Sequence, residues 1–65
     1  MSIKELGQLI RKMRKEQKLT QEELAMASGT RERFISDLEN GKETIQIGKA
    51  FSVIQSLGLK IHIER

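Results

Sequence analysis

Residues 20–42, TQEELAMASGTRERFISDLENGK, contain the clearest helix start and stop signals of the chain. This stretch opens on a capping box, in which the Thr20 hydroxyl can accept from the backbone of Glu23 and the Glu23 carboxylate from the backbone of Thr20. A helix is therefore expected over residues 21–28. Gly29 suits the left-handed position at which many helices end.

A second helix is expected directly after this glycine. Thr30 is its expected N-cap, and the helix spans residues 31–39 until Asn40 and Gly41 end it. Two short helices joined by a tight turn that contains glycine form a helix-turn-helix arrangement.

The N-terminal segment also predicts a helix. Ser2 and Glu5 form another capping box, and apolar side chains follow at helical spacing. The stripe expected to face the core comprises Ile3, Leu6, Leu9, Ile10 and Met13. Gly7 interrupts this helix at a cost of about 1 kcal/mol against alanine, which close packing would explain.

A fourth helix is expected over residues 47–57, and Gly58 ends it. Its expected buried stripe comprises Ile47, Ala50, Phe51, Ile54 and Leu57. In the helix over residues 21–28, we expect Leu24 to be buried together with Ala25 or Ala27.

The C-terminal tail changes period. Residues 59–64 alternate apolar and polar side chains, which predicts a half-buried strand with Leu59, Ile61 and Ile63 on one face. A lone strand leaves its backbone groups unpaired, so the favoured hypothesis is an antiparallel pair with the same strand of a second copy. Residues 1–58 would then form the helical domain and residues 59–65 a dimerisation strand. The alternative is a frayed tail on the fourth helix.

Length and composition exclude several classes of protein. The chain of 65 residues makes one small domain, and without cysteine and with a single histidine it has no disulfide and no zinc site. We expect no metal and no cofactor. The longest apolar run has four residues, which predicts no membrane span and no secretion signal, so the expected compartment is the cytoplasm.

Charge is unevenly distributed along the chain. Residues 1–18 carry six basic and two acidic side chains, a net charge of +4. Residues 19–43 carry three basic and six acidic side chains (−3), and residues 44–65 carry three basic and one acidic side chain (+2). The basic first segment suits a polyanion such as nucleic acid, and equally an ordinary solvated helix face. A membrane-surface role is disfavoured, because the apolar stripe of this segment lacks Trp and Phe and is needed for the core.

The residues that catalysis needs are scarce. His62 is the one histidine, Asp37 the one aspartate, and the glycines are isolated, so no phosphate-binding loop and no nucleophile with a base beside it can be assembled. We expect that the protein is not an enzyme.

The residues that are candidates for contact with DNA bases lie on one face of the helix over residues 31–39. On a helical wheel Ile35 and Leu38 face the core, with Phe34 at their flank, and polar side chains face the opposite way. The candidate base-reading residues are Arg33, Arg31, Glu32, Ser36 and Asp37. Arginine reads guanine through two parallel hydrogen bonds, and Asp37, four residues after Arg33, could orient that arginine or accept from cytosine. The alternative is a solvated face with an ordinary helical ion pair.

Candidate phosphate contacts flank this helix. Thr20 and Gln21 lie at the N-terminus of the preceding helix, where free backbone amides carry partial positive charge. Lys42 lies just past the helix over residues 31–39, after Asn40 and Gly41. The partner these residues imply is double-stranded DNA, entered through its major groove.

The combination of TQEELA (residues 20–25) with ISDLENGK (residues 35–42) resembles the XRE and Cro/C1 family of helix-turn-helix DNA-binding proteins. The resemblance covers about residues 3–58 and implies an all-α, lambda-repressor-like fold of four to five short helices, beside the C-terminal strand. It implies base-reading positions at Arg31, Glu32, Arg33 and Asp37, and phosphate contacts at Gln21 and Lys42. It also implies an internal ion pair between Arg14 and Glu39.

The segment SLGLKI (residues 56–61) is similar to the end of HipB-type antitoxin domains, in which a C-terminal strand pairs across a dimer. This resemblance implies a dimeric repressor of its own operon with a HipA-like kinase toxin as partner. Two alternatives stay open. The main role could be to hold the toxin, or the protein could be a stand-alone phage-type repressor.

Overall fold

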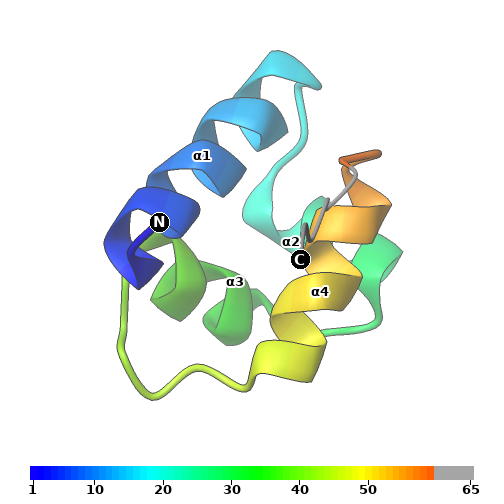
Figure 1. Ribbon diagram of the computed structural model, residues 1–65. Coiled ribbons are helices and arrows are strands. Elements are labelled where there is room, and N and C mark those ends of the chain that lie inside the picture. Colours follow the sequence, from blue (N-terminus) through cyan, green and yellow to red (C-terminus); the bar gives the residue numbers. More distant parts are fainter. Residues whose placement is uncertain (60–65) are drawn as a thin grey trace.

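The computed structural model describes residues 1–59, which form four helices and no strand (Figure 1). The helices are α1 (Ile3–Glu16), α2 (Gln21–Ser28), α3 (Glu32–Glu39) and α4 (Ile47–Ser56). α2, α3 and α4 lie within one residue of their predicted bounds, and α1 begins after Ser2 as predicted, so the helical part of the predicted fold is confirmed. None of the helices in this part of the chain is long and apolar enough to span a membrane.

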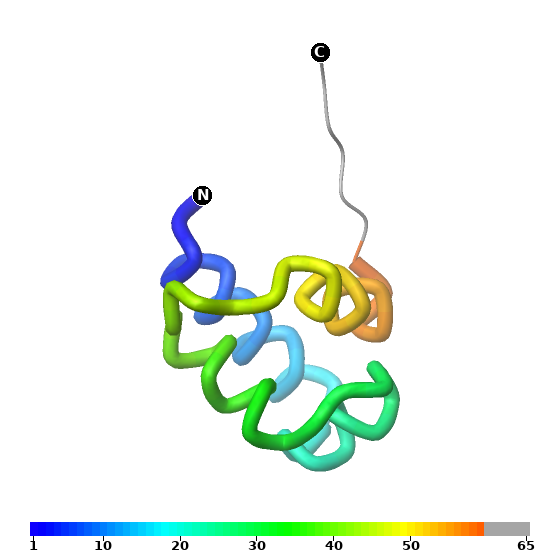
Figure 2. The backbone as a smooth tube through the Cα atoms, turned by 90° about the horizontal axis from the view of Figure 1, so that it is seen from below, coloured from blue at the N-terminus to red at the C-terminus, as the bar shows by residue number. Residues whose placement is uncertain are grey.

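The four helices surround one core. α2 packs against both α3 and α4, and α1 packs against α3. In Figure 2, α2 and α3 lie along the lower side and α4 lies above α2. A further tie joins α1 to the end of α4, because the Gln17 side-chain amide donates to the Leu57 carbonyl at 2.8 Å. The fully buried large side chains are Ile10, Leu24, Ile35, Leu38 and Val53.

The predicted stripe of α4 is partly wrong. Ala50, Ile54 and Leu57 are buried as expected, but Ile47 is 57% exposed and Phe51 41% exposed. Val53, which the prediction left out, is fully buried. Because α4 packs chiefly on α2, only the arc of its surface around Ala50 and Val53 is covered. In α2 the buried alanine is Ala25, whereas Ala27 is exposed.

Both predicted capping boxes are present. Ser2 Oγ accepts from the Glu5 amide at 3.1 Å, and Thr20 Oγ1 accepts from the Glu23 amide at 3.0 Å. The return hydrogen bond from the Ser2 backbone lowers the pKa of Glu5 below its usual value. The contribution of this cap to stability is therefore present above the ordinary pKa of Glu5 and is lost as the pH falls through its lowered value.

The predicted N-cap of α3 is wrong by one residue. The N-cap is Arg31, which makes no side-chain cap hydrogen bond. Thr30 belongs to the end of α2 instead: its amide donates to the Ala25 carbonyl at 2.9 Å, and its hydroxyl lies 2.8 Å from Ser28 Oγ. Gly29 has φ +69°, as its predicted left-handed position requires.

The predicted C-terminal strand mostly lies outside the described residues. Ile61 and Ile63 lie outside the described residues, so their role in dimerisation stays a prediction. Leu59 is described: it is half-buried against the core, and its amide donates to the Ile54 carbonyl at 3.2 Å.

Close packing explains the glycine within α1. A Cβ atom at Gly7 would lie 2.2 Å from the Leu38 carbonyl oxygen and 3.0 Å from that of Glu39. These are backbone atoms, so a side chain here would push α1 away from the end of α3. Gly7 thus sets the distance between the two helices.

This close approach predicts opposite effects of one chemical change at two helical glycines. Gly7→Ala should lower the free energy of unfolding by about 1–3 kcal/mol, because the methyl group overpacks against backbone. Gly48→Ala should raise it by up to about 1 kcal/mol, because nothing lies within 4 Å of that position and alanine favours the helix. Urea denaturation of both variants checks this. A Gly7→Ala variant as stable as the wild type would contradict the described packing.

Candidate nucleic-acid interface

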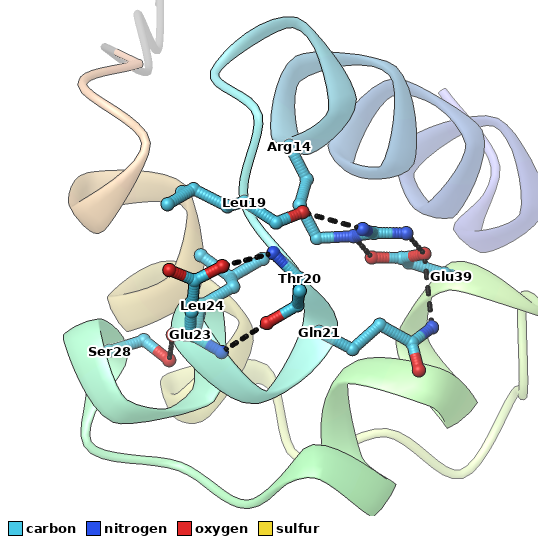
Figure 3. A network of polar contacts seen from close by, with 8 residues as sticks. All are labelled: Arg14, Leu19, Thr20, Gln21, Glu23, Leu24, Ser28 and Glu39. Carbon is cyan, nitrogen blue, oxygen red and sulfur yellow. Dashed lines mark hydrogen bonds and ion pairs between the residues drawn. The ribbon is translucent and has the colours of Figure 1, made fainter.

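A buried ion pair ties α1 to the end of α3. Arg14 Nε donates to Glu39 Oε2 at 2.7 Å, and Nη2 donates to Oε1 at 3.0 Å (Figure 3). The two side chains are only 10% and 3% exposed. The carboxylate raises the pKa of Arg14 above its ordinary value, against the opposing effect of desolvation. This is the internal ion pair that the resemblance implied.

The same pair fixes the segment that leads into α2. Arg14 Nη1 donates to the Leu19 carbonyl at 2.8 Å, just before the N-cap Thr20. From the first turn of α2, Gln21 Nε2 donates to Glu39 Oε1 at 3.2 Å. Figure 3 shows Arg14 and Gln21 both contacting the Glu39 carboxylate, while Arg14 also contacts the Leu19 carbonyl. Among residues 1–59, no buried side-chain nitrogen or oxygen lacks a hydrogen-bond partner.

Gln21 therefore has a second role beside its predicted phosphate contact. One N–H of its amide is used on Glu39, and the other remains to donate outward. Thr20, the other predicted phosphate residue of this end, is exposed, and its hydroxyl oxygen accepts the capping bond from Glu23. The hydroxyl hydrogen is left to donate. Both residues lie at the N-terminal end of α2, where the helix dipole favours an anion.

α3 carries the residues predicted to contact DNA bases, and its opposite face is packed in the core. Ile35 and Leu38 are fully buried, so this face of the helix is held by the core. Arg31, Glu32 and Arg33 are exposed at the N-terminal end of α3, and Ser36 and Asp37 are half-buried one turn further on. The structure thus brings together all five predicted base-reading residues on α3 and its N-cap.

Of the two roles considered for Asp37, an ion pair that orients Arg33 is not formed in the structure. Asp37 Oδ2 lies 3.5 Å from Lys42 Nζ instead, because the turn after α3 carries Lys42 back beside the helix. Among residues 1–59, Arg33 makes no ion pair and is left to contact a ligand. The Asp37–Lys42 pair is half-exposed, so a phosphate could replace the carboxylate at little cost.

A hollow of about 410 Å³ lies beside the predicted base-reading residues. It is lined by Gly29, Thr30, Arg31, Arg33, Phe34, Asp37 and Lys49. Lys49, from the first turn of α4, was not among the predicted site residues. A helical wheel places it at the edge of the buried arc of α4 but does not say which neighbour it meets, so no signal in the sequence identified it.

Comparison with known proteins agrees with this geometry. A family model described as Helix-turn-helix matches residues 10–63. The chain belongs to the XRE-type helix-turn-helix family. It is 54% identical over 59 residues to an uncharacterized HTH-type transcriptional regulator, y4mF, of Sinorhizobium fredii, which covers 91% of this chain and 78% of that protein.

Two solved structures have the same fold, and the comparison with each covers 100% of this chain. One is described as "MDT Protein" and the other as the structure of a HipA-HipB-O2-O3 complex. Each has a TM-score of 0.89 and 28% sequence identity to this chain. The match covers 92% of each of those two chains. The XRE-type chain is thus a helix-turn-helix transcriptional regulator with HipB-like structural neighbours, and its helix-turn-helix domain implies DNA binding.

The position of Arg33 predicts a base-specific effect. Arg33→Ala should weaken binding to the preferred site by about 1–3 kcal/mol and relax the preference at one base pair, because one bidentate contact is lost. Selection from a randomised site measures the preference directly. Arg11→Ala on α1 is the matched control and should leave every base preference intact. An unchanged preference in the Arg33 variant would remove Arg33 as a reader.

Proposed function

We propose that this regulator is a sequence-specific repressor that binds as a homodimer to an inverted-repeat operator. The observation that carries the proposal is the exposed row Arg31, Glu32 and Arg33 at the start of a helix whose other face is fully buried. In this docking, α3 enters the major groove and its N-terminal residues meet the base edges. The proposed activity is DNA binding without a catalytic step, and the proposed compartment is the cytoplasm.

Phosphate contacts on both sides of α3 would fix its orientation. Thr20 and Gln21 at the start of α2 would bind one phosphate through their remaining donors. Lys42 would bind another after α3, exchanging Asp37 for the phosphate. These contacts carry no sequence information and make affinity depend on salt.

The proposed dimer rests on the sequence of the tail. Residues 59–65 would form a strand that pairs with its copy, with Leu59, Ile61 and Ile63 on one face. Leu59 is half-buried directly after α4, so the strand would start from a fixed point beside the core. Two reading helices related by a two-fold axis would require half-sites about 34 Å apart, one turn of the DNA.

The physiological role proposed is that of an autoregulating antitoxin with a HipA-like kinase toxin as partner. The similarity to a chain of the HipA-HipB-O2-O3 complex supports this setting. The alternatives are an antitoxin whose main task is to hold the toxin, and a stand-alone phage-type repressor. A kinase-like gene that overlaps the gene of this protein would favour the first two over the last.

Binding to DNA from immediately upstream of its own gene tests the proposal. Affinity should be measured over a series of salt concentrations with unrelated DNA as competitor. We expect tight binding at an inverted repeat, with the logarithm of the association constant falling by about 0.9 per phosphate contact for each tenfold rise in salt. Binding no tighter than to the competitor would contradict a repressor that acts alone.

A further inference from the structure

The hollow beside α3 is bordered by three cations that come from different elements. Arg31 is the N-cap of α3, Arg33 lies in its first turn, and Lys49 lies in the first turn of α4. Among the residues that the structure describes, none of the three forms an ion pair. The carboxylate in the lining, Asp37, has Lys42 as its partner at 3.5 Å. The hollow therefore offers uncompensated positive charge.

Lys49 is held at this hollow by an aromatic ring. Its Nζ lies over the Phe34 ring, 6.0 Å from the centroid, at the distance of a cation–π contact. Phe34 itself is half-buried and packs against the core. The contact with Phe34 thus places the Lys49 ammonium group next to α3.

A further contact to DNA follows from this placement, given the proposed function on which it rests. We infer that Lys49 binds a backbone phosphate of the DNA strand beside the N-terminal end of α3, and that the first turn of α4 belongs to the interface. The walls of the major groove are phosphates, and a lysine on the neighbouring helix faces a wall when α3 lies in the groove. A compact ammonium suits a phosphate as a point charge, whereas bidentate base reading suits the planar guanidinium of Arg31 and Arg33.

The test compares salt dependence in three variants. Lys49→Gln removes the charge at similar length, Lys49→Arg keeps the charge, and Lys12→Gln removes an exposed lysine of α1 as a matched control. Affinity is measured for the upstream DNA and for an unrelated duplex from low to high salt. Circular dichroism confirms that each variant keeps its helices.

Lys49→Gln should weaken binding to both duplexes by the same factor, about fivefold to tenfold at 0.1 M salt, and reduce the salt slope by about 0.9. Lys49→Arg and Lys12→Gln should keep the wild-type slope. The inference is overturned by an unchanged slope in Lys49→Gln, by an equal loss in Lys49→Arg, or by a loss confined to one base pair.

The experiment also distinguishes failure of the proposed repressor function, and binding of free anions, from the proposed role of Lys49. If the wild type binds the upstream DNA no better than the unrelated duplex, the proposed repressor fails, yet the slope of Lys49→Gln on the unrelated duplex still tests Lys49. Inorganic phosphate at constant ionic strength should not displace DNA. Displacement from the wild type but not from Lys49→Gln would make the hollow a site for free anions and overturn the inference.

Discussion

The buried pair of Arg14 and Glu39 is the interaction on which the arrangement of the helices depends. Its guanidinium holds the end of α3 with two nitrogens and the Leu19 carbonyl with the third. The carboxylate in turn holds Gln21 at the start of α2. A hydrophobic core alone tolerates sliding of one helix along another, whereas directed hydrogen bonds fix one arrangement. Gly7 adds to this constraint, because its lack of a side chain lets α1 reach the backbone of α3.

This constraint links the core to the proposed DNA contacts. α2 and α3 are short, with eight residues each, and isolated helices of this length are marginal in water. Their relative position comes from the core beneath and from the network at their joined ends. Arg31 and Arg33, the proposed base readers, are exposed and form no ion pair among residues 1–59. Substitution at either position is therefore expected to leave the fold intact.

Local signals predicted most of the fold. The capping boxes at Ser2 and Thr20 and the glycine after α2 located helix ends, because these interactions lie within four residues of sequence. Thr30 is bound locally at the end of α2, through Ala25 and Ser28, and this competes with its predicted role as the N-cap of α3. Tertiary context decides how α4 is covered, and Phe51 at its outer edge stays exposed. For the same reason the predicted site lacked Lys49, since no spacing along the chain shows that α4 meets Phe34.

The affinity of the double variant Arg14→Met/Glu39→Met for the upstream DNA tests most directly whether the buried pair positions α3. Neither residue is exposed enough to touch DNA, and replacing both with apolar side chains leaves no unpaired buried charge, so the helices should still fold. Because Gln21 and α3 lose their directed anchor, we predict that affinity falls by about tenfold, equivalent to about 1.4 kcal/mol. A folded double variant with wild-type affinity would contradict the claim that this pair positions the reading helix.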